Sequence, residues 1–531
     1  MSAGASRGGG RQGQRRREVR AARERARLRR GVLAVLVAAP VLAASPAAGT
    51  NAAAPLAVHA KAAGRAGAQL AVGESALSVS SNPASIIELP RLRLDGSLGW
   101  LITRSRFQND LNDRLSTSFD TVTGAGGVVW DPASDPDDPW GPGSEVRLGF
   151  AIFVPVGGGG SSELKTPVFP EGETEASTFF FLTAMPSIAV RVHPKLAIGF
   201  GLNLIWLRLE TEGLVGSNDN SGGLVFRYFT PEGQPIQPPE PVLVEGQQVT
   251  WQEVFDLADT EDANESSRIE VTDVNGFGIG AHVGLVWRPL PELSFGLSYR
   301  TPGFVPKASG RARLDASRAI EALRADPQLQ AILQGLLEAH LPNRGARGFR
   351  ARYDFEIERF DMPAVLAGGL AWRPSADWLI ALDLRYIFWS DAFGEEEVTL
   401  RNGTNDDINE INGSDRLRDK KLLRWDDQFT VALGTAWRIP QLSEELVFRL
   451  GYNYGNNPQP ASTFTANTGI LEHHLSVGLG WMHGAWDFDL AYVYGFPNEI
   501  RVRRSDAGRA YDDSAASAEQ HFLHFGIGYQ F

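Results

Sequence analysis

The chain has 531 residues, a formal net charge of −12 and no cysteine. The absence of cysteine excludes disulfides, a thiol nucleophile and cysteine-built metal sites. No apolar run reaches about 18 residues, which excludes a bundle of transmembrane helices. Residues 1–30 hold 11 Arg against 2 Glu. The rest of the chain is therefore strongly acidic, and we expect no nucleic-acid partner.

Residues 1–48 have the features of an export signal. An Arg-rich start leads into the apolar run 32–42, and small residues follow at 43–48. This is the order of a basic region, an apolar core and a signal-peptidase site. A permanent anchor helix is the less favoured alternative, because the run is short and Pro40 interrupts it. We therefore expect a signal peptide over residues 1–48 and an exported mature chain.

From residue 91 onward, large apolar side chains alternate with small or polar ones. Near the C-terminus, for example, Leu523 and Phe525 alternate with His524 and Gly526. This period of two predicts β-strands. A soluble sheet would pack its large residues together inside, whereas a membrane barrel turns them toward lipid. Because the second face is mostly Gly, Ala and charged residues, residues 90–531 are predicted to be all-β, a transmembrane antiparallel β-barrel of about 14 strands.

An acidic run spaced by prolines follows the second predicted strand. It consists of Asp131, Asp135, Asp137 and Asp138. Carboxylates are calcium ligands, but this spacing fits no EF-hand loop. A solvated outer loop is therefore the favoured interpretation, and calcium binding is the open alternative.

Pro155 lies inside the strand-like run 149–156 and is followed by four glycines. Proline cannot donate a hydrogen bond to a β-ladder, and consecutive glycines weaken pairing. We therefore predict a local break in the barrel wall at Pro155, Gly157 and Gly158, which opens the lumen sideways.

Residues 315–341 depart from the period of two and are predicted to be helical. Asp326 is a natural N-cap and Pro327 a natural first-turn residue. An apolar stripe with helical spacing follows, made of Leu329, Ile332, Leu333, Leu336 and Leu337. The helices either cover each other and the barrel rim or line a groove that receives ligand. On the second interpretation these five residues are the predicted ligand-binding set.

Tryptophans mark one end of successive strands. Trp287, Trp372, Trp437 and Trp481 each close an alternating run, and a short connection follows each of them. The other connections are long and polar. An aromatic girdle, short turns on one side and long loops on the other are typical of outer-membrane barrels. Every short turn falls on the side of the C-terminus.

No sequence motif of an enzyme is present. The chain lacks GxSxG, HExxH and a phosphate loop. His473 and His474 are adjacent in a strand, so they face opposite sides and cannot bind one ion together. Charged residues on the predicted lumen face could act in gating or catalysis, or they could form a polar network that braces the barrel and hatch. The bracing network is the favoured interpretation. These residues are Arg300, Asp383, Arg385, Arg449, Asp487 and Asp489. We expect no enzymatic activity, no cofactor and no metal.

Residues 64–89 are rich in small side chains, do not alternate and precede the first strand. With Asn82, Pro83 and Ala84, this segment resembles the N-terminal hatch of the FadL/TodX family of outer-membrane transporters. Residues 149–157 (GFAIFVPVG), 277–301 and 382–393 (LDLRYIFWSDAF) are similar to further segments of that family. The chain departs from the family in having Val156 where Phe is common and a long insertion around 211–268.

This resemblance implies a hatch over residues 49–89 inside the barrel. It also implies passive transport of hydrophobic small molecules, such as long-chain fatty acids or aromatic hydrocarbons, in the bacterial outer membrane. Ligand would be captured at the outer loops, pass to a pocket beside the hatch and leave through a gap at the third strand.

The expected partners are the hydrophobic ligand, outer-membrane lipid and lipopolysaccharide, and the outer-membrane assembly machinery. The C-terminal strand ending in Phe531 resembles the recognition signal of that machinery, and we expect a monomer. A general diffusion porin without a plug and a lipid-acting barrel enzyme are the alternative functions.

Overall fold

The structure is a computed structural model. It describes residues 50–113, 115–133, 145–166, 169–214, 242–244, 247–249, 267–325, 327, 330–341, 343, 345–346, 348–440, 442–464 and 469–531. The predicted signal peptide therefore lies outside the described residues.

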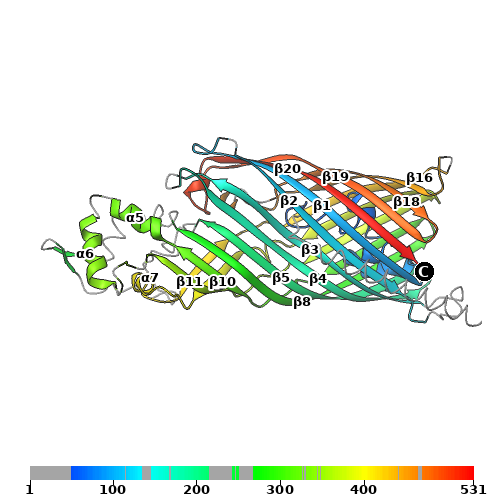
Figure 1. The fold of residues 1–531 in the computed structure, drawn as a ribbon. Coiled ribbons are helices and arrows are strands. Elements are labelled where there is room, and N and C mark those ends of the chain that lie inside the picture. The colour runs from blue at the N-terminus through cyan, green and yellow to red at the C-terminus, as the bar shows by residue number, and fades with distance from the viewer. Residues whose placement is uncertain are drawn as a thin grey trace, which may run out of the picture.

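Fourteen strands form a closed antiparallel barrel, which confirms the predicted architecture (Figure 1). They are β1 (Leu92–Gln108), β2 (Leu115–Trp130), β3 (Val146–Leu164), β4 (Glu173–His193), β5 (Leu196–Leu214), β8 (Arg268–Leu290), β9 (Leu293–Arg300), β12 (Val365–Ser375), β13 (Trp378–Ile387), β16 (Gln428–Arg438), β17 (Leu446–Gly455), β18 (His473–His483), β19 (Trp486–Val502) and β20 (Ser514–Gln530). Each strand pairs with the next, and β20 pairs with β1, with Tyr529 opposite Leu94. Closure leaves no unpaired sheet edge, which lipid could not satisfy.

The outer surface of the barrel is apolar, as the alternation predicts. Large apolar side chains that face outward are about half exposed, among them Leu297, Leu433 and Phe525. The four girdle tryptophans are exposed by 43–53%. Their ladder partners place each of them at a strand end next to a short turn. Trp378, for example, lies opposite Trp437 in the ladder between β13 and β16. These rings form the aromatic belt of one membrane interface.

At the opposite end, four further strands extend the sheet of β8 away from the barrel (Figure 1). They are β10 (Ala308–Asp315), β11 (Arg350–Ile357), β14 (Glu395–Arg401) and β15 (Leu417–Leu422), paired in the order β8, β10, β11, β14, β15. Within β8, Asp273 has a φ of +56°, and register shifts interrupt the ladders on both sides of the strand near this residue. We call these four strands and their helices the outer extension.

Three helices belong to the outer extension. They are α5 (Ser317–Ala325), α6 (Gln330–His340) and α7 (Asp406–Ile411), and they lie at its far end in Figure 1. The first two fall within the region predicted to be helical. A separate two-stranded sheet pairs β6 (Val242–Val244) with β7 (Gln247–Val249). No helix among the described residues is long and apolar enough to cross a membrane.

The acidic run is not on an outer loop, and that prediction is wrong for its one described member. Asp131 directly follows β2, whose last residue, Trp130, pairs with Leu92 at the C-terminal end of the barrel. Strand parity therefore places it on the side of the short turns. Its buried carboxylate lies 3.0 Å from the guanidinium of Arg147. The other three aspartates lie outside the described residues.

The segment before β1 lies inside the barrel. It contains α2 (Ala60–Ala63) and two 3-10 helices, η1 (Ala76–Ser80) and η2 (Pro83–Glu88). In Figure 1 it is the dark blue chain within the strands, near the end that carries the C-terminus. We call the described residues 50–89 the hatch. Nearly all of them are buried.

Candidate functional site

The hatch is held against the barrel wall at glycines that face the lumen. A Cβ atom added to Gly199 would collide with Pro83 and Ala84, and one added to Gly284 would collide with Asn82. Gly434 and Gly451 approach the backbone of Arg65 in the same way, and Gly296 approaches Leu70. The small residues of the lumen face therefore provide the room that the hatch occupies.

Asn82, Pro83 and Ala84 connect the hatch to β8. The fully buried Asn82 accepts a hydrogen bond from the Ala84 amide at 3.0 Å and so caps η2, with Pro83 in its first turn. Its side-chain amide donates to the carbonyl of Leu70 at 2.9 Å and to that of Leu285 in β8 at 3.1 Å. One side chain therefore orders the hatch internally and ties it to the wall.

We predict that Asn82→Ala loosens the hatch. The substitution removes the donor to two buried carbonyls, and an unsatisfied buried group costs about 1–3 kcal/mol. The expected result is a larger ion current through the purified barrel in a planar bilayer. Asn109→Ala, the same change beyond the outer end of β1, is the matched control and should leave the current unchanged. A current equal to that of the wild type in Asn82→Ala would show that this residue does not hold the hatch.

Charged lumen residues brace the hatch, as the favoured interpretation of the sequence has it. The buried carboxylate of Asp383 accepts hydrogen bonds from the amides of Gln69 at 2.8 Å and Leu70 at 3.0 Å. Arg385 donates to the carbonyl of Gly67 at 2.7 Å. These contacts hold the middle of the hatch against β13.

A second group of charges ties α2 of the hatch to β19. Lys61 lies 2.8 Å from Asp487 and 3.8 Å from Asp489. Asp487 also pairs with Arg93 at 2.6 Å, and Asp489 pairs with Arg449 at 2.9 Å. The sequence analysis indicated Arg449 of β17 and the two aspartates of β19 as lumen charges. It did not indicate Lys61 or Arg93, because no local pattern shows which residues of the hatch and of distant strands come into contact.

The wall is interrupted where β3 passes Pro155. The ladder between β2 and β3 runs only from Trp130↔Leu148 to Gly126↔Ile152, although both strands continue outward and are fully described. On the other side, the pairing of β3 with β4 shifts register between Phe153 and Val156. The amide of Gly157 donates to the carbonyl of Ala53 in the hatch at 2.8 Å. The predicted residues Pro155, Gly157 and Gly158 thus lie beside the hatch, in a stretch of β3 that is not paired with β2, although Gly157 and Gly158 still pair with β4.

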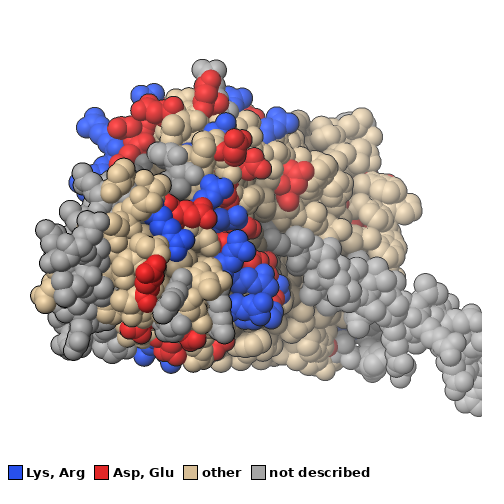
Figure 2. Space-filling model, turned by 60° about the vertical axis from the view of Figure 1, so that its left-hand side comes forward, with Lys and Arg blue, Asp and Glu red and all other residues tan. Residues whose placement is uncertain are grey.

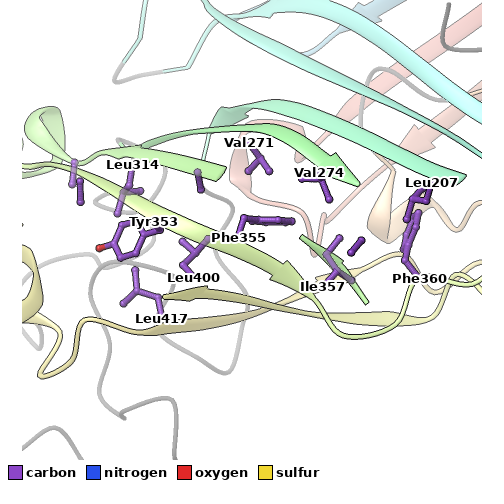
Figure 3. Packing of buried hydrophobic residues seen from close by; sticks show 14 of the residues in the cluster. Leu207, Val271, Val274, Leu314, Tyr353, Phe355, Ile357, Phe360, Leu400 and Leu417 are labelled. Atoms are coloured by element: carbon purple, nitrogen blue, oxygen red, sulfur yellow. The ribbon is translucent and has the colours of Figure 1, made fainter. Parts of the chain in front are cut away.

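One continuous apolar cluster connects the outer extension to this stretch of wall. Its members come from α6, from the outer strands, from the upper barrel and from the hatch, and Figure 3 shows part of the row between the strands. Leu314, Tyr353, Leu400 and Leu417 lie toward the helices, Val271 and Phe355 in the middle, and Leu207, Ile357 and Phe360 toward the barrel. Val156 and Ala53 belong to the same cluster.

The predicted ligand-binding stripe lies inside this cluster. Leu333, Leu336 and Leu337 are at most 1% exposed, and Ile332 packs against them as a partly buried residue. Leu329 lies outside the described residues. In this structure the stripe therefore packs into the apolar interior of the outer extension and is not open to ligand. A role in ligand capture requires the helices to part and stays a prediction.

Six aromatic rings line the cluster next to the wall break. Phe181, opposite Val156 in the ladder, stacks on Phe360 at 5.8 Å, and Phe360 stacks on Phe393 at 5.3 Å. Phe179, Trp389 and Trp425 complete the group with edge-on or tilted contacts at 5.0–6.4 Å. The sequence did not predict this group, since its members come from distant segments. Two local signals were the run Phe179–Phe180–Phe181 and the family-like segment 382–393, which contains Trp389 and Phe393.

A buried acidic residue follows Phe393 of the aromatic group by three positions in the chain. Glu396 of β14 is 8% exposed. Burial raises the pKa of its carboxyl to about 7, and the carboxylate of Asp361 acts in the same direction. Near neutral pH this side chain is therefore protonated in part of the molecules, which lowers the negative charge beside the apolar cluster.

The exposed surface of the outer extension is highly charged. Figure 2 shows Lys and Arg interspersed with Asp and Glu at this end, whereas the barrel flank is almost free of both. A concave region of about 580 Å³ lies over β8, β10 and β11. Its arginines are mostly paired, for example Arg313 with Glu270 at 2.9 Å and Arg350 with Asp315 at 2.8 Å. The change from charged to apolar surface marks where the chain leaves the membrane.

A family model described as outer membrane protein transport protein (OMPP1/FadL/TodX) matches residues 40–531. The chain belongs to this family. It is therefore an outer-membrane barrel of a family of transport proteins. No curated protein sequence matches the chain. Among the described residues, no group of three or more His, Cys, Asp or Glu side chains is placed to hold a metal ion.

Solved structures of this family share the fold. The Pseudomonas putida toluene transporter TodX has a TM-score of 0.62 at 17% identity, covering 90% of this chain and 99% of that one. A Pseudomonas aeruginosa FadL homologue has a TM-score of 0.61 at 15% identity, covering 90% and 100%. The Ralstonia pickettii toluene transporter TbuX has a TM-score of 0.58 at 16% identity, covering 90% and 98%.

Proposed function

We propose that this protein carries hydrophobic small molecules passively through the outer membrane and releases them sideways through its wall. The observation that supports this most strongly is the end of the β2–β3 ladder at Ile152, near the contact of Gly157 with Ala53 of the hatch. A ligand that cannot pass along the barrel axis still has an exit there. An apolar ligand gains by leaving directly into the lipid.

The apolar cluster supports the rest of the route. It joins the outer helices to Val156 at the wall break through buried apolar side chains. We propose that ligand is captured at the outer extension and moves along these side chains while the hatch closes the axial path. The related proteins TodX and TbuX are toluene transporters. Aromatic hydrocarbons and long-chain fatty acids are therefore the ligand classes that we propose for this chain.

Two other functions fit these contacts less well. A general diffusion porin needs an open aqueous lumen, whereas here buried hydrogen bonds and ion pairs fasten the hatch to the wall. A lipid-acting barrel enzyme needs a nucleophile beside a base. The family is one of transport proteins, and the sequence has no motif for such chemistry.

Uptake by cells tests the proposal. A Gram-negative host without its own members of the family would be supplied with labelled toluene or labelled oleate, with and without this protein. We expect faster uptake of at least one compound, unchanged when the proton-motive force is dissipated, and little ion current through the purified barrel. A large ion current with no uptake of either compound would instead indicate a porin.

We also propose that the outer-membrane assembly machinery recognises β20. Phe531, which follows β20, donates its amide to the Leu92 carbonyl at 3.0 Å, and its ring lies 4.6 Å from that of Tyr529. Deleting Phe531 is expected to lower the amount of heat-modifiable barrel without changing export of the chain. Wild-type amounts of inserted barrel after the deletion would contradict this role.

We further propose that the barrel works as a monomer embedded in outer-membrane lipid and lipopolysaccharide.

A further inference from the structure

The outward face of the sheet continues from the membrane into the concave region over β8, β10 and β11. Phe277, which is 73% exposed, is the last large apolar residue on the outward face of β8. Glu270 follows further out on this face, opposite the exposed Arg313 of β10. At about 3.3 Å per residue and a strand tilt of about 40°, this stretch rises roughly 15–20 Å above the apolar band. At that height the outward face meets the sugars of lipopolysaccharide and no longer its acyl chains.

Charged side chains line the concave region, whose volume is about 580 Å³. This volume lies within the roughly 300–1,000 Å³ that is usual for sites of small ligands. An apolar ligand would have to strip water from these charges, which is unfavourable. A sugar is complementary, because its hydroxyl groups can donate to carboxylates and accept from guanidinium groups. The polar lining consists of Arg268, Arg313, Arg350, Arg352, Glu212, Glu270, Asp315 and Thr404.

Three of the four arginines have acidic partners. Arg313 pairs with Glu270 at 2.9 Å, and Arg350 pairs with Asp315 at 2.8 Å. Arg268 lies 2.6 Å from Glu212 and 2.8 Å from Glu173. These pairs fix the walls of the concave region and leave little net charge on them.

Arg352 of β11 is the exception. It is exposed and forms no ion pair with any other residue that the structure describes. The next acid on its face of the strand, Asp354, accepts a hydrogen bond from Asn402 at 2.6 Å. In the ladder between β10 and β11, Arg352 lies directly opposite Arg313. Like charges in that position repel each other. A phosphate between them would remove the repulsion, because a guanidinium binds phosphate with two parallel hydrogen bonds.

We propose that the concave region binds a phosphorylated core sugar of lipopolysaccharide, with the phosphate held between Arg352 and Arg313. Both the height of the region above the apolar band and its charged lining favour this occupant. Bound there, lipopolysaccharide anchors the outer extension in the sugar layer of the membrane. This site goes beyond the proposed transport function and does not depend on it.

Two forms of lipopolysaccharide test the site. Purified barrel in nanodiscs of phosphatidylethanolamine would be titrated with rough lipopolysaccharide that carries a phosphorylated core. A second titration would use material from a strain that cannot phosphorylate its core sugars, and displacement of a fluorescent lipopolysaccharide would report binding. We expect the phosphorylated form to bind about tenfold tighter, as one good charged contact allows. The difference should shrink at high salt, which screens exposed charges.

Variants at Arg352 assign the difference to the site. Arg352→Gln should weaken binding of the phosphorylated form about tenfold and leave binding of the other form unchanged. Arg352→Lys should keep part of the preference, since it retains the charge without the planar fork. Arg503→Gln is the matched control, because it removes an exposed arginine just beyond the outer end of β19. It should leave both affinities unchanged.

Three results would overturn this inference. The first is equal binding of both forms by the wild type. The second is a heat-modifiable Arg352→Gln barrel that binds both forms as the wild type does, or that loses both equally. The third is displacement by millimolar inorganic phosphate that matches displacement by core sugars released from the same lipopolysaccharide, because the site would then recognise free phosphate. None of these results bears on passive transport.

Discussion

A barrel in which β2 is cross-linked to β3 just beyond Ile152 is expected to lose transport. If the ladder continued past Gly126↔Ile152, Gly124 would lie opposite Val154. The natural chain has no cysteine, so Gly124→Cys with Val154→Cys provides a single thiol pair. Oxidation should draw the two strands together across the proposed exit and lower uptake by about tenfold or more, a barrier increase of at least ~1.4 kcal/mol. A reductant should restore uptake.

The matched control places the same bridge inside the intact ladder. Val128 and Phe150 are already paired, so a disulfide between Val128→Cys and Phe150→Cys should not change transport in either redox state. If the oxidised Gly124→Cys/Val154→Cys barrel carried ligand as fast as the reduced one, the opening between β2 and β3 would not be the exit.

Replacing Leu333 and Leu336 by asparagine is expected to loosen the outer extension. Both side chains are fully buried in the apolar cluster. Removing each buried leucine costs about 2–5 kcal/mol, and the new amides must then be buried or the helices must part. We expect faster proteolysis between α5 and α6, an intact heat-modifiable barrel and slower uptake at limiting ligand. Ala331→Asn with Gln334→Asn changes the exposed face of the same helix and is the control.

Protease resistance separates the two interpretations of the stripe. A double variant that resists protease like the wild type, but loses uptake only at limiting ligand, would assign these leucines to ligand capture. Unchanged resistance together with unchanged uptake would contradict both interpretations.

The sequence predicts the barrel well because lipid imposes a simple rule on each strand. In an alternating run that ends in Trp287 or Trp437, the large residues identify the face toward lipid and the tryptophan identifies the membrane interface. Neither inference requires the neighbouring strands to be known. Pro155 predicts a weak point in the wall for a similarly local reason, since it has no amide hydrogen to donate. The hatch contact of Asn82 was indicated only by a resemblance, because the capping motif alone fits any turn.

The outer extension shows where the period of two is ambiguous. Arg311 and Arg313 alternate with Ala312 and Leu314, as in a membrane strand. Here, however, the charged face is exposed and the apolar face is buried. Alternation predicts a strand but does not decide which face meets water.

The candidate site depends on register between distant segments. Asp383 accepts from the amides of Gln69 and Leu70 only because β13 pairs with β16 in one particular register. The contact of Phe360 with Phe181 joins residues far apart in the chain. A one-residue slip would send each of these side chains to the opposite face. Such contacts between distant residues follow from the closure of the barrel rather than from any local sequence pattern.

The central claim is that ligand leaves sideways while the hatch stays in place, and a hatch fixed by a disulfide tests it directly. A Cβ atom added to Gly526 of β20 would lie 3.1 Å from the Cβ of Ala60. This is close to the roughly 3.5–4.5 Å that a disulfide needs, so Ala60→Cys with Gly526→Cys should bridge the hatch to the wall after a small shift. We expect the oxidised and reduced barrels to take up labelled ligand at the same rate. Loss of uptake on oxidation, with recovery on reduction, would show that the hatch must move and would contradict the lateral route.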